Sequence, residues 1–111
     1  MGFFSEKEFR HERFTYDCVW RRVSGGAPSH VFEVQVHGNL FEALTRLKHA
    51  FDLWNSRLFL VAPDKDIKKA RWMADGSFHE IQTRVDFLEP WQVAEFYSDK
   101  LKVANIEKRL R

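Results

Sequence analysis

The sequence predicts an α/β fold, a mixed β-sheet with flanking helices, formed by a single domain of residues 1–111. Three observations lead to this prediction. Residues 15–22 and 30–37 alternate with the period of two that is typical of strands. Residues 40–54 carry an apolar stripe with helical spacing, and the continuous apolar run of residues 57–62 follows. A strand, a helix and a buried strand in this order indicate a βαβ unit.

The two alternating stretches are expected to pair as an antiparallel hairpin, because residues 24–29 between them are turn formers. One face of the second strand is apolar and can pack on a core; it carries Phe32, Val34 and Val36. The opposite face is mostly polar and carries Val31, Glu33, Gln35 and His37. A polar face of an antiparallel sheet is either solvated or holds a functional site, and both interpretations stay open here.

The register of this hairpin decides which side chains meet. If Arg22 faces His30, Asp17 faces Gln35, and Glu33 projects from the same side. A shift of the register by two residues keeps these side chains together, whereas a shift of one separates them. Two carboxylates on neighbouring strands can hold a hard divalent cation, which prefers oxygen ligands. The main-chain carbonyl of Val34 is a candidate third ligand.

Capping residues bound the helices. Asn39 is expected to cap the helix of residues 40–54, with Glu42 in its first turn. A second helix is predicted from Asp64, as its N-cap, to about Ala74.

Both ends of the chain also carry patterns. Residues 78–87 alternate and predict a strand at the sheet edge, and Pro90 is expected to open a last helix. The inner stripe of that helix comprises Val93, Phe96, Tyr97, Leu101 and Ala104. Residues 1–14 are predicted either as a short helix with a capping box of Ser5 and Glu8 or as an extended arm.

Composition excludes few function classes. Lys and Arg number 18 against 16 Asp and Glu, so any DNA-binding surface must come from local placement. Cys18 is the single cysteine, so an internal disulfide is excluded, and one thiol fits a reducing cytoplasm. The sequence also contains no cysteine–histidine cluster with the spacing of a zinc site. The sequence contains neither a membrane-spanning apolar run nor a visible signal peptide, so a cytoplasmic location and no membrane partner are expected.

The residues and their order resemble the PD-(D/E)xK nuclease superfamily, whose fold is restriction-endonuclease-like. The match begins at Tyr16-Asp17, includes Glu33-Val34-Gln35 and extends to residue 62, about half of the chain. The resemblance implies hydrolysis of phosphodiester bonds in DNA with Mg²⁺ (or Mn²⁺) as cofactor. Asp17 and Glu33 would be the metal ligands and, with Gln35, the catalytic residues.

Three features depart from the superfamily pattern. Gln35 stands where the superfamily carries Lys; an amide can orient a water molecule but supplies no charge and no base. Tyr16 replaces the Pro of the motif. The superfamily has a helix and a strand before the Asp-bearing strand, and only sixteen residues precede Asp17. The resemblance therefore implies a minimal or N-terminally shortened core.

Basic and histidine side chains near this site are candidates for contacts with the DNA backbone. They are His37, Arg46, Lys48, His49, Lys68 and Lys69. Solvated helix faces and an exposed strand end explain the same residues, so the alternative function is an inactive nuclease-like module that binds DNA or a protein, either alone or as a domain of a larger protein. The aromatic content, 15% of the chain, is consistent with a homodimer interface.

Overall fold

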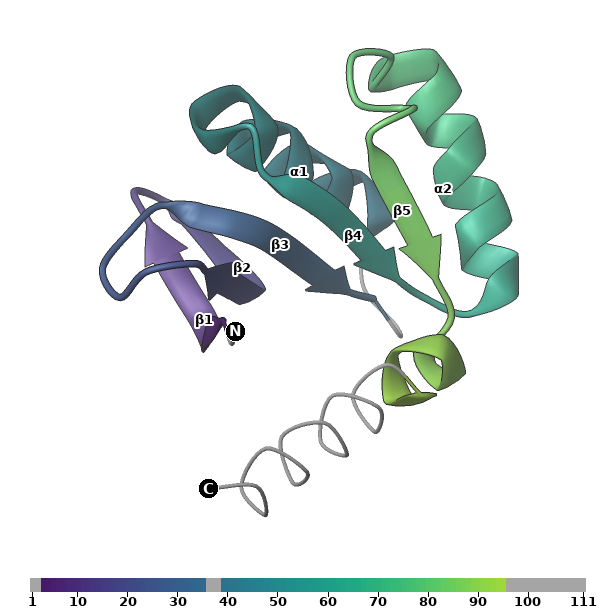
Figure 1. The fold of residues 1–111 in the computed structure, drawn as a ribbon. Coiled ribbons are helices and arrows are strands. Elements are labelled where there is room, and N and C mark those ends of the chain that lie inside the picture. Colours follow the sequence, from purple (N-terminus) through teal and green to yellow (C-terminus); the bar gives the residue numbers. More distant parts are fainter. Residues whose placement is uncertain (1–2, 36–38, 96–111) are drawn as a thin grey trace.

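A five-stranded mixed sheet organises the protein, whose structure is a computed structural model that describes residues 3–35 and 39–95 (Figure 1). In chain order the elements are β1 (Phe4–His11), β2 (Phe14–Arg21), β3 (Pro28–Val34), α1 (Leu40–Trp54), β4 (Arg57–Val61), α2 (Asp64–Ser77) and β5 (Val85–Leu88). None of the helices in the described part of the chain has the length and apolar character needed to cross a membrane.

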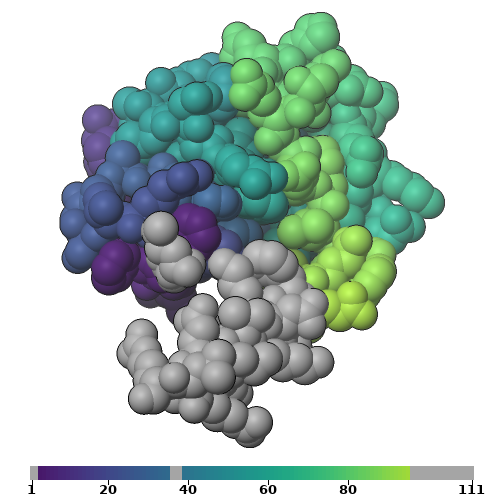
Figure 2. All heavy atoms as spheres, in the orientation of Figure 1, coloured from purple at the N-terminus to yellow at the C-terminus, as the bar shows by residue number. Residues whose placement is uncertain are grey.

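The strands lie side by side in the order in which they occur in the sequence, β1-β2-β3-β4-β5. The β1–β2 and β2–β3 pairs are antiparallel, and the β3–β4 and β4–β5 pairs are parallel, so β2 alone runs against the others. The predicted mixed sheet and the predicted βαβ unit are confirmed. Figures 1 and 2 show the β1–β2 hairpin and the α2–β5 segment on opposite sides of the molecule.

Helix α1 begins and ends where the sequence predicts. The Oδ1 atom of Asn39 accepts a hydrogen bond from the backbone N–H of Glu42 at 3.2 Å, as expected of an N-cap. At the other end, Asn55 adopts a left-handed conformation with φ of 52° and donates its N–H to the carbonyl of Phe51, which terminates the helix. Leu44 and Leu47 lie on the buried face of α1.

The core lies between the sheet and both helices. Leu58 and Leu60 of β4 project from one face of the sheet, as expected from strand alternation, and both are fully buried. They share one apolar cluster with residues of α1 and with Ala70 and Ala74 of α2. Because each helix contacts this cluster, α1 and α2 cover the same face of the sheet.

Helix α2 differs from its prediction at both ends. Pro63, rather than Asp64, precedes the first helical residue, and its carbonyl accepts hydrogen bonds from the N–H groups of Asp66 and Ile67. The backbone of Pro63 thus replaces the side-chain cap that was expected from Asp64. The helix continues to Ser77, one turn beyond the predicted end.

The predicted strand over residues 78–87 is mostly wrong. Phe78 and Ile81 are both buried although they lie three residues apart, a spacing that strand alternation does not give. Residues 78–84 form turns instead, in which the N–H of Ile81 donates to the carbonyl of Phe78 and the N–H of Arg84 donates to the carbonyl of Ile81. Strand β5 begins only at Val85. The predicted position at the sheet edge is confirmed.

The N-terminal segment is a strand. Residues 4–11 form β1 and pair with β2, with Phe9 opposite Tyr16 and His11 opposite Phe14. The predicted short helix with its capping box of Ser5 and Glu8 is therefore wrong. A strand of eight residues therefore precedes the Asp-bearing strand, and the contact between the Phe9 and Tyr16 rings joins the two strands.

The last predicted helix is described only at its start. Residues 90–95 are helical, and Val93, the first member of the predicted stripe, donates its N–H to the carbonyl of Glu89. The other members of that stripe lie outside the described residues, as do Val36 and His37.

Candidate functional site

Strands β2 and β3 bring Asp17 and Glu33 together. Trp20 lies opposite His30, so the register is shifted by two residues from the predicted one, and Asp17 still lies next to Glu33 on the neighbouring strand. The regular backbone pairing of β2 and β3 ends at Cys18 and Phe32, and hydrogen bonds from backbone N–H groups to side chains follow it. The backbone N–H of Asp17 donates to Glu33 Oε2 at 3.0 Å, and the backbone N–H of Val34 donates to Asp17 Oδ2 at 2.8 Å.

A local irregularity in β2 makes this exchange of hydrogen bonds possible. Tyr16 and Val19 are both fully buried although they lie three positions apart, so the strict alternation of β2 breaks between them. On the neighbouring strand Glu8 has a left-handed φ of 51°, a conformation that is uncommon outside glycine. The irregularity frees the N–H group of Asp17 to bind a side chain instead of the ladder.

The buried face of β3 is the opposite of the expected one. Glu33 is 0% exposed and Gln35 is also buried, whereas Val34, on the face expected to pack on a core, is 46% exposed. The interpretation of the Glu33 face as solvated is therefore wrong for the described residues. The cause is α1, which covers the Glu33 side and supplies Arg46 as a partner for the acid.

Both oxygens of Glu33 accept hydrogen bonds. Oε2 binds the N–H of Asp17, and Oε1 forms an ion pair with Nε of Arg46. The pKa of Glu33 is raised to about 7, mainly because the side chain is buried and partly because of the nearby charge of Asp17, while the hydrogen bonds from the Asp17 backbone and from Arg46 oppose the shift. Near neutral pH, Glu33 is therefore divided between its charged and neutral forms.

Gln35 directly follows β3. Its backbone N–H donates to the carbonyl of Val61 at 2.8 Å, which extends the parallel contact between β3 and β4 by one residue. Glu33 and Gln35 thus both lie at the carboxyl end of β3. The N–H of Val34 binds Asp17, while its carbonyl, the predicted third metal ligand, keeps that role as a prediction.

The predicted DNA contacts do not form one basic surface. Arg46 is turned toward Glu33, and Lys48 forms ion pairs with Asp52 at 2.7 Å and Glu80 at 3.0 Å. Those two acids raise the pKa of Lys48 by hydrogen bonding to its amine. The two remaining lysines, Lys68 and Lys69, lie exposed on α2, and Lys68 pairs with Asp64. The last candidate, His37, lies outside the described residues.

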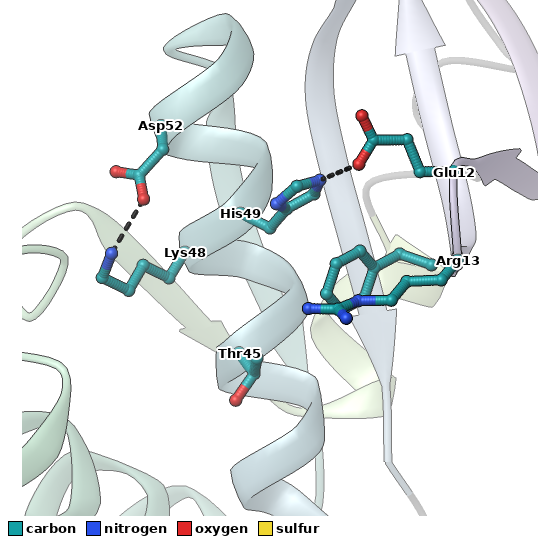
Figure 3. A pocket seen from close by; sticks show the side chains of 7 residues that line it. Glu12, Arg13, Thr45, Lys48, His49 and Asp52 are labelled. Atoms are coloured by element: carbon teal, nitrogen blue, oxygen red, sulfur yellow. Dashed lines mark hydrogen bonds and ion pairs between the residues drawn. The ribbon is translucent and has the colours of Figure 1, made fainter.

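His49, predicted as a DNA contact, instead belongs to a cluster that sequence spacing does not indicate. Ligand atoms of His11, Glu12 and His49 all lie within 4.8 Å of one another. A pocket of about 440 Å³ adjoins them (Figure 3); it is lined by Glu12, Arg13, Phe14, Thr45, Lys48, His49 and Asp52. In the sequence, only the adjacent pair His11-Glu12 could have indicated this cluster, because its third member, His49, lies 37 residues after Glu12.

Comparisons with family models, curated proteins and solved structures found no match for this chain. The resemblance to the PD-(D/E)xK superfamily therefore stays a proposal that rests on the residues and on the order of the elements. The coarser statement, a mixed α/β sheet with helices, stands on the fold itself.

Proposed function

We propose that the protein is a metal-dependent nuclease of the restriction-endonuclease-like type, with Asp17 and Glu33 as ligands for Mg²⁺ or Mn²⁺ and DNA as substrate. The observation that carries the proposal is the pair of reciprocal hydrogen bonds that holds these two acids together between β2 and β3. The order of elements adds support, since the Asp-bearing strand, the Glu-bearing strand, a helix and a parallel strand follow one another as the resemblance implies.

The donor chemistry of the pair fits a hard divalent cation. Carboxylate oxygens are the ligands that Mg²⁺ prefers, and each oxygen retains a second lone pair after accepting one hydrogen bond. The charge of Asp17 contributes to the raised pKa of Glu33, so the two acids repel each other when both are ionised. A cation between two such acids would relieve that repulsion and favour the ionised form of Glu33.

The position of the pair also favours ligand binding. Glu33 and Gln35 lie at the carboxyl end of β3, and β4 and β5 run parallel to β3. In open sheets with parallel strands, ligands bind beyond the carboxyl ends of those strands.

Each residue has a distinct role in this proposal. Asp17 and Glu33 hold the cation, Arg46 fixes the orientation of the Glu33 carboxylate, and Gln35 orients a water molecule through its amide. A bound magnesium ion lowers the pKa of a coordinated water molecule and offsets charge on the phosphodiester. Gln35 adds no charge of its own, so the rate is expected to be lower than with a lysine at this position.

Asp17→Asn tests the proposal, because Asn retains an oxygen that can accept the hydrogen bond from Val34 but removes the charge. Wild-type protein is expected to bind Mn²⁺ in calorimetry and to nick plasmid DNA only with metal. Asp17→Asn should reduce both binding and cleavage by about 10²-fold or more, since a charged ligand is lost. Asp86→Asn, a change at an exposed acid on β5, is the matched control and should leave both unchanged. Cleavage that persists in Asp17→Asn would overturn the assignment.

The second candidate is a nuclease-like module that binds DNA or a protein without cutting. The ion pair between Arg46 and Glu33 favours it, because a guanidinium already occupies one oxygen of the buried acid. In this case Mn²⁺ should produce neither heat nor thermal stabilisation in the wild-type protein. The homodimer inferred from the aromatic content stays a prediction under either function.

A further inference from the structure

We propose that His11, Glu12 and His49 form a binding site for a transition metal, with Zn²⁺ as the ion that fits best. The site joins the turn between β1 and β2 to the middle of α1. It is separate from the acids between β2 and β3, and it does not depend on the nuclease proposal.

The ligand atoms of the three side chains lie close enough together to bind one ion after small movements. They all lie within 4.8 Å of one another. Glu12 Oε1 lies 3.7 Å from His11 Nε2, and Glu12 Oε2 lies 3.9 Å from His49 Nε2, so the two oxygens of one carboxylate face the two imidazoles. Both distances exceed the range of hydrogen bonds. Tetrahedral zinc, bound at about 2.0–2.1 Å, places neighbouring ligand atoms roughly 3.4 Å apart, so side-chain movements of roughly 1 Å would bring one atom of each residue to that spacing.

Backbone conformation places the carboxylate between the two imidazoles. His11 is the last residue of β1, and Glu12 follows in the turn with a left-handed φ of 56°, which few residues other than glycine adopt. His49 projects from α1 toward this turn, and Figure 3 shows its ring and the Glu12 carboxylate pointing at each other.

Aromatic contacts hold both imidazole rings in place. The ring of His49 lies 4.4 Å from that of Phe14, and the ring of His11 lies 5.0 Å from that of Trp54 in an edge-on arrangement. The Nε2 atom of His49 is buried and has no hydrogen-bond partner among the described residues. A buried polar atom without a partner is costly, and a bond to a metal would remove that cost.

The ligand set selects the class of metal. Two imidazoles and one carboxylate are a common set for zinc, cobalt or nickel, whereas magnesium prefers oxygen ligands alone. Three protein ligands leave a fourth position for water. Glu12 and His49 also line the adjacent pocket, which gives that position access to solvent.

Stabilisation of the hairpin is the expected effect of the metal. Most residues of β1 are exposed, so apolar burial contributes little to its attachment. A metal ion bound by His11, Glu12 and His49 would connect this edge of the sheet to α1. Because the ion would bind only the folded state, it would raise the stability of the whole chain.

Zinc binding by the full chain, after removal of metals with a chelator, tests this proposal. Calorimetry is expected to give one Zn²⁺ per chain, thermal unfolding should shift upward with zinc, and Co²⁺ should give the visible absorption of a four-coordinate site. His11→Gln and His49→Gln should each weaken zinc binding by at least about tenfold, because each removes a ligand. Glu12→Gln, at a side chain that is 64% exposed, should weaken binding without threatening the fold.

His79 provides a matched control. Its ring bonds to the Gln82 side chain, so His79→Gln should leave the zinc affinity unchanged. Equal zinc affinity in wild type, His49→Gln and Glu12→Gln would overturn the proposal, as would a loss of binding confined to His79→Gln.

Discussion

At the scale of single residues, Glu33 connects the fold to the proposed chemistry. Its side chain is fully buried, and its two oxygens bind the Asp17 backbone and the Arg46 guanidinium. Burial of a charged acid is unfavourable, and these partners offset only part of the cost, since the pKa of Glu33 stays raised at about 7. The residue that would bind a metal is thus also one whose charge opposes folding.

The raised pKa of Glu33 predicts how stability depends on pH. The folded protein binds the proton more tightly than the unfolded chain, in which the pKa is near 4.5, so the stabilisation is complete below pH 4.5 and is lost as pH rises through 7. The free energy of unfolding should fall by on the order of 3 kcal/mol over this range from this residue. Urea unfolding at several pH values measures it.

Glu33→Gln is the variant that isolates this effect, because the amide cannot titrate. Its pH profile should be flatter between pH 5 and 7 than that of the wild type, whereas Asp86→Asn should keep the wild-type profile. Equal slopes in wild type and Glu33→Gln would show that another group governs the pH dependence.

At the scale of elements, α1 is the best-specified part of the chain. Asn39 caps its N-terminus and Asn55 terminates it, so both ends are set by local side-chain and backbone chemistry. The same helix carries Arg46, which pairs with Glu33, and His49, which faces the β1–β2 turn. Its exact start and rotation therefore position both candidate sites.

Asn39→Ala should lower the free energy of unfolding by about 1 kcal/mol, because the N–H of Glu42 loses its acceptor. Chemical denaturation measures the change. Asn39→Asp is the matched control and should restore the cap, with an added favourable interaction between its charge and the helix dipole. A loss of similar size in both variants would mean that the side-chain cap contributes nothing.

At the scale of the whole molecule, the centre and one edge of the sheet differ in burial. Leu58 and Leu60 of the interior strand β4 are fully buried beneath α1 and α2, whereas most of β1 is exposed at one edge. Local opening is easiest where few apolar contacts are buried. The β1–β2 hairpin should therefore open more readily than the βαβ unit.

Hydrogen exchange of backbone amides tests this difference. Amides of β3 and β4 should exchange most slowly, and those of β1 should exchange at least about tenfold faster, as expected for local rather than global opening. Added zinc should slow exchange in β1 and around His49, because local opening of the hairpin would release the metal. Uniform protection across the sheet would contradict this description of the fold.

Patterns confined to neighbouring residues predicted the structure well. The α1 stripe and its Asn39 cap were sufficient for that helix, and the apolar run after it was sufficient for β4. The prediction failed over residues 78–84. Their sequence alternates as a strand would, but the chain forms turns there, which bury both Phe78 and Ile81 in the core. For β1, local patterns left a short helix and an extended arm both open, because strand formation there depends on pairing with β2 rather than on local propensity.

The sequence by itself determined the order of the elements from β2 to α2, because periodicity and capping act over a few residues. It also predicted that Asp17 and Glu33 come together, and hydrogen bonds between their two strands join them in the structure. Only the tertiary structure decided which face of β3 is buried, because that depends on the side on which α1 packs. The same packing brings His49 to His11 and Glu12, and no spacing along the chain encodes a contact between residues so far apart in sequence.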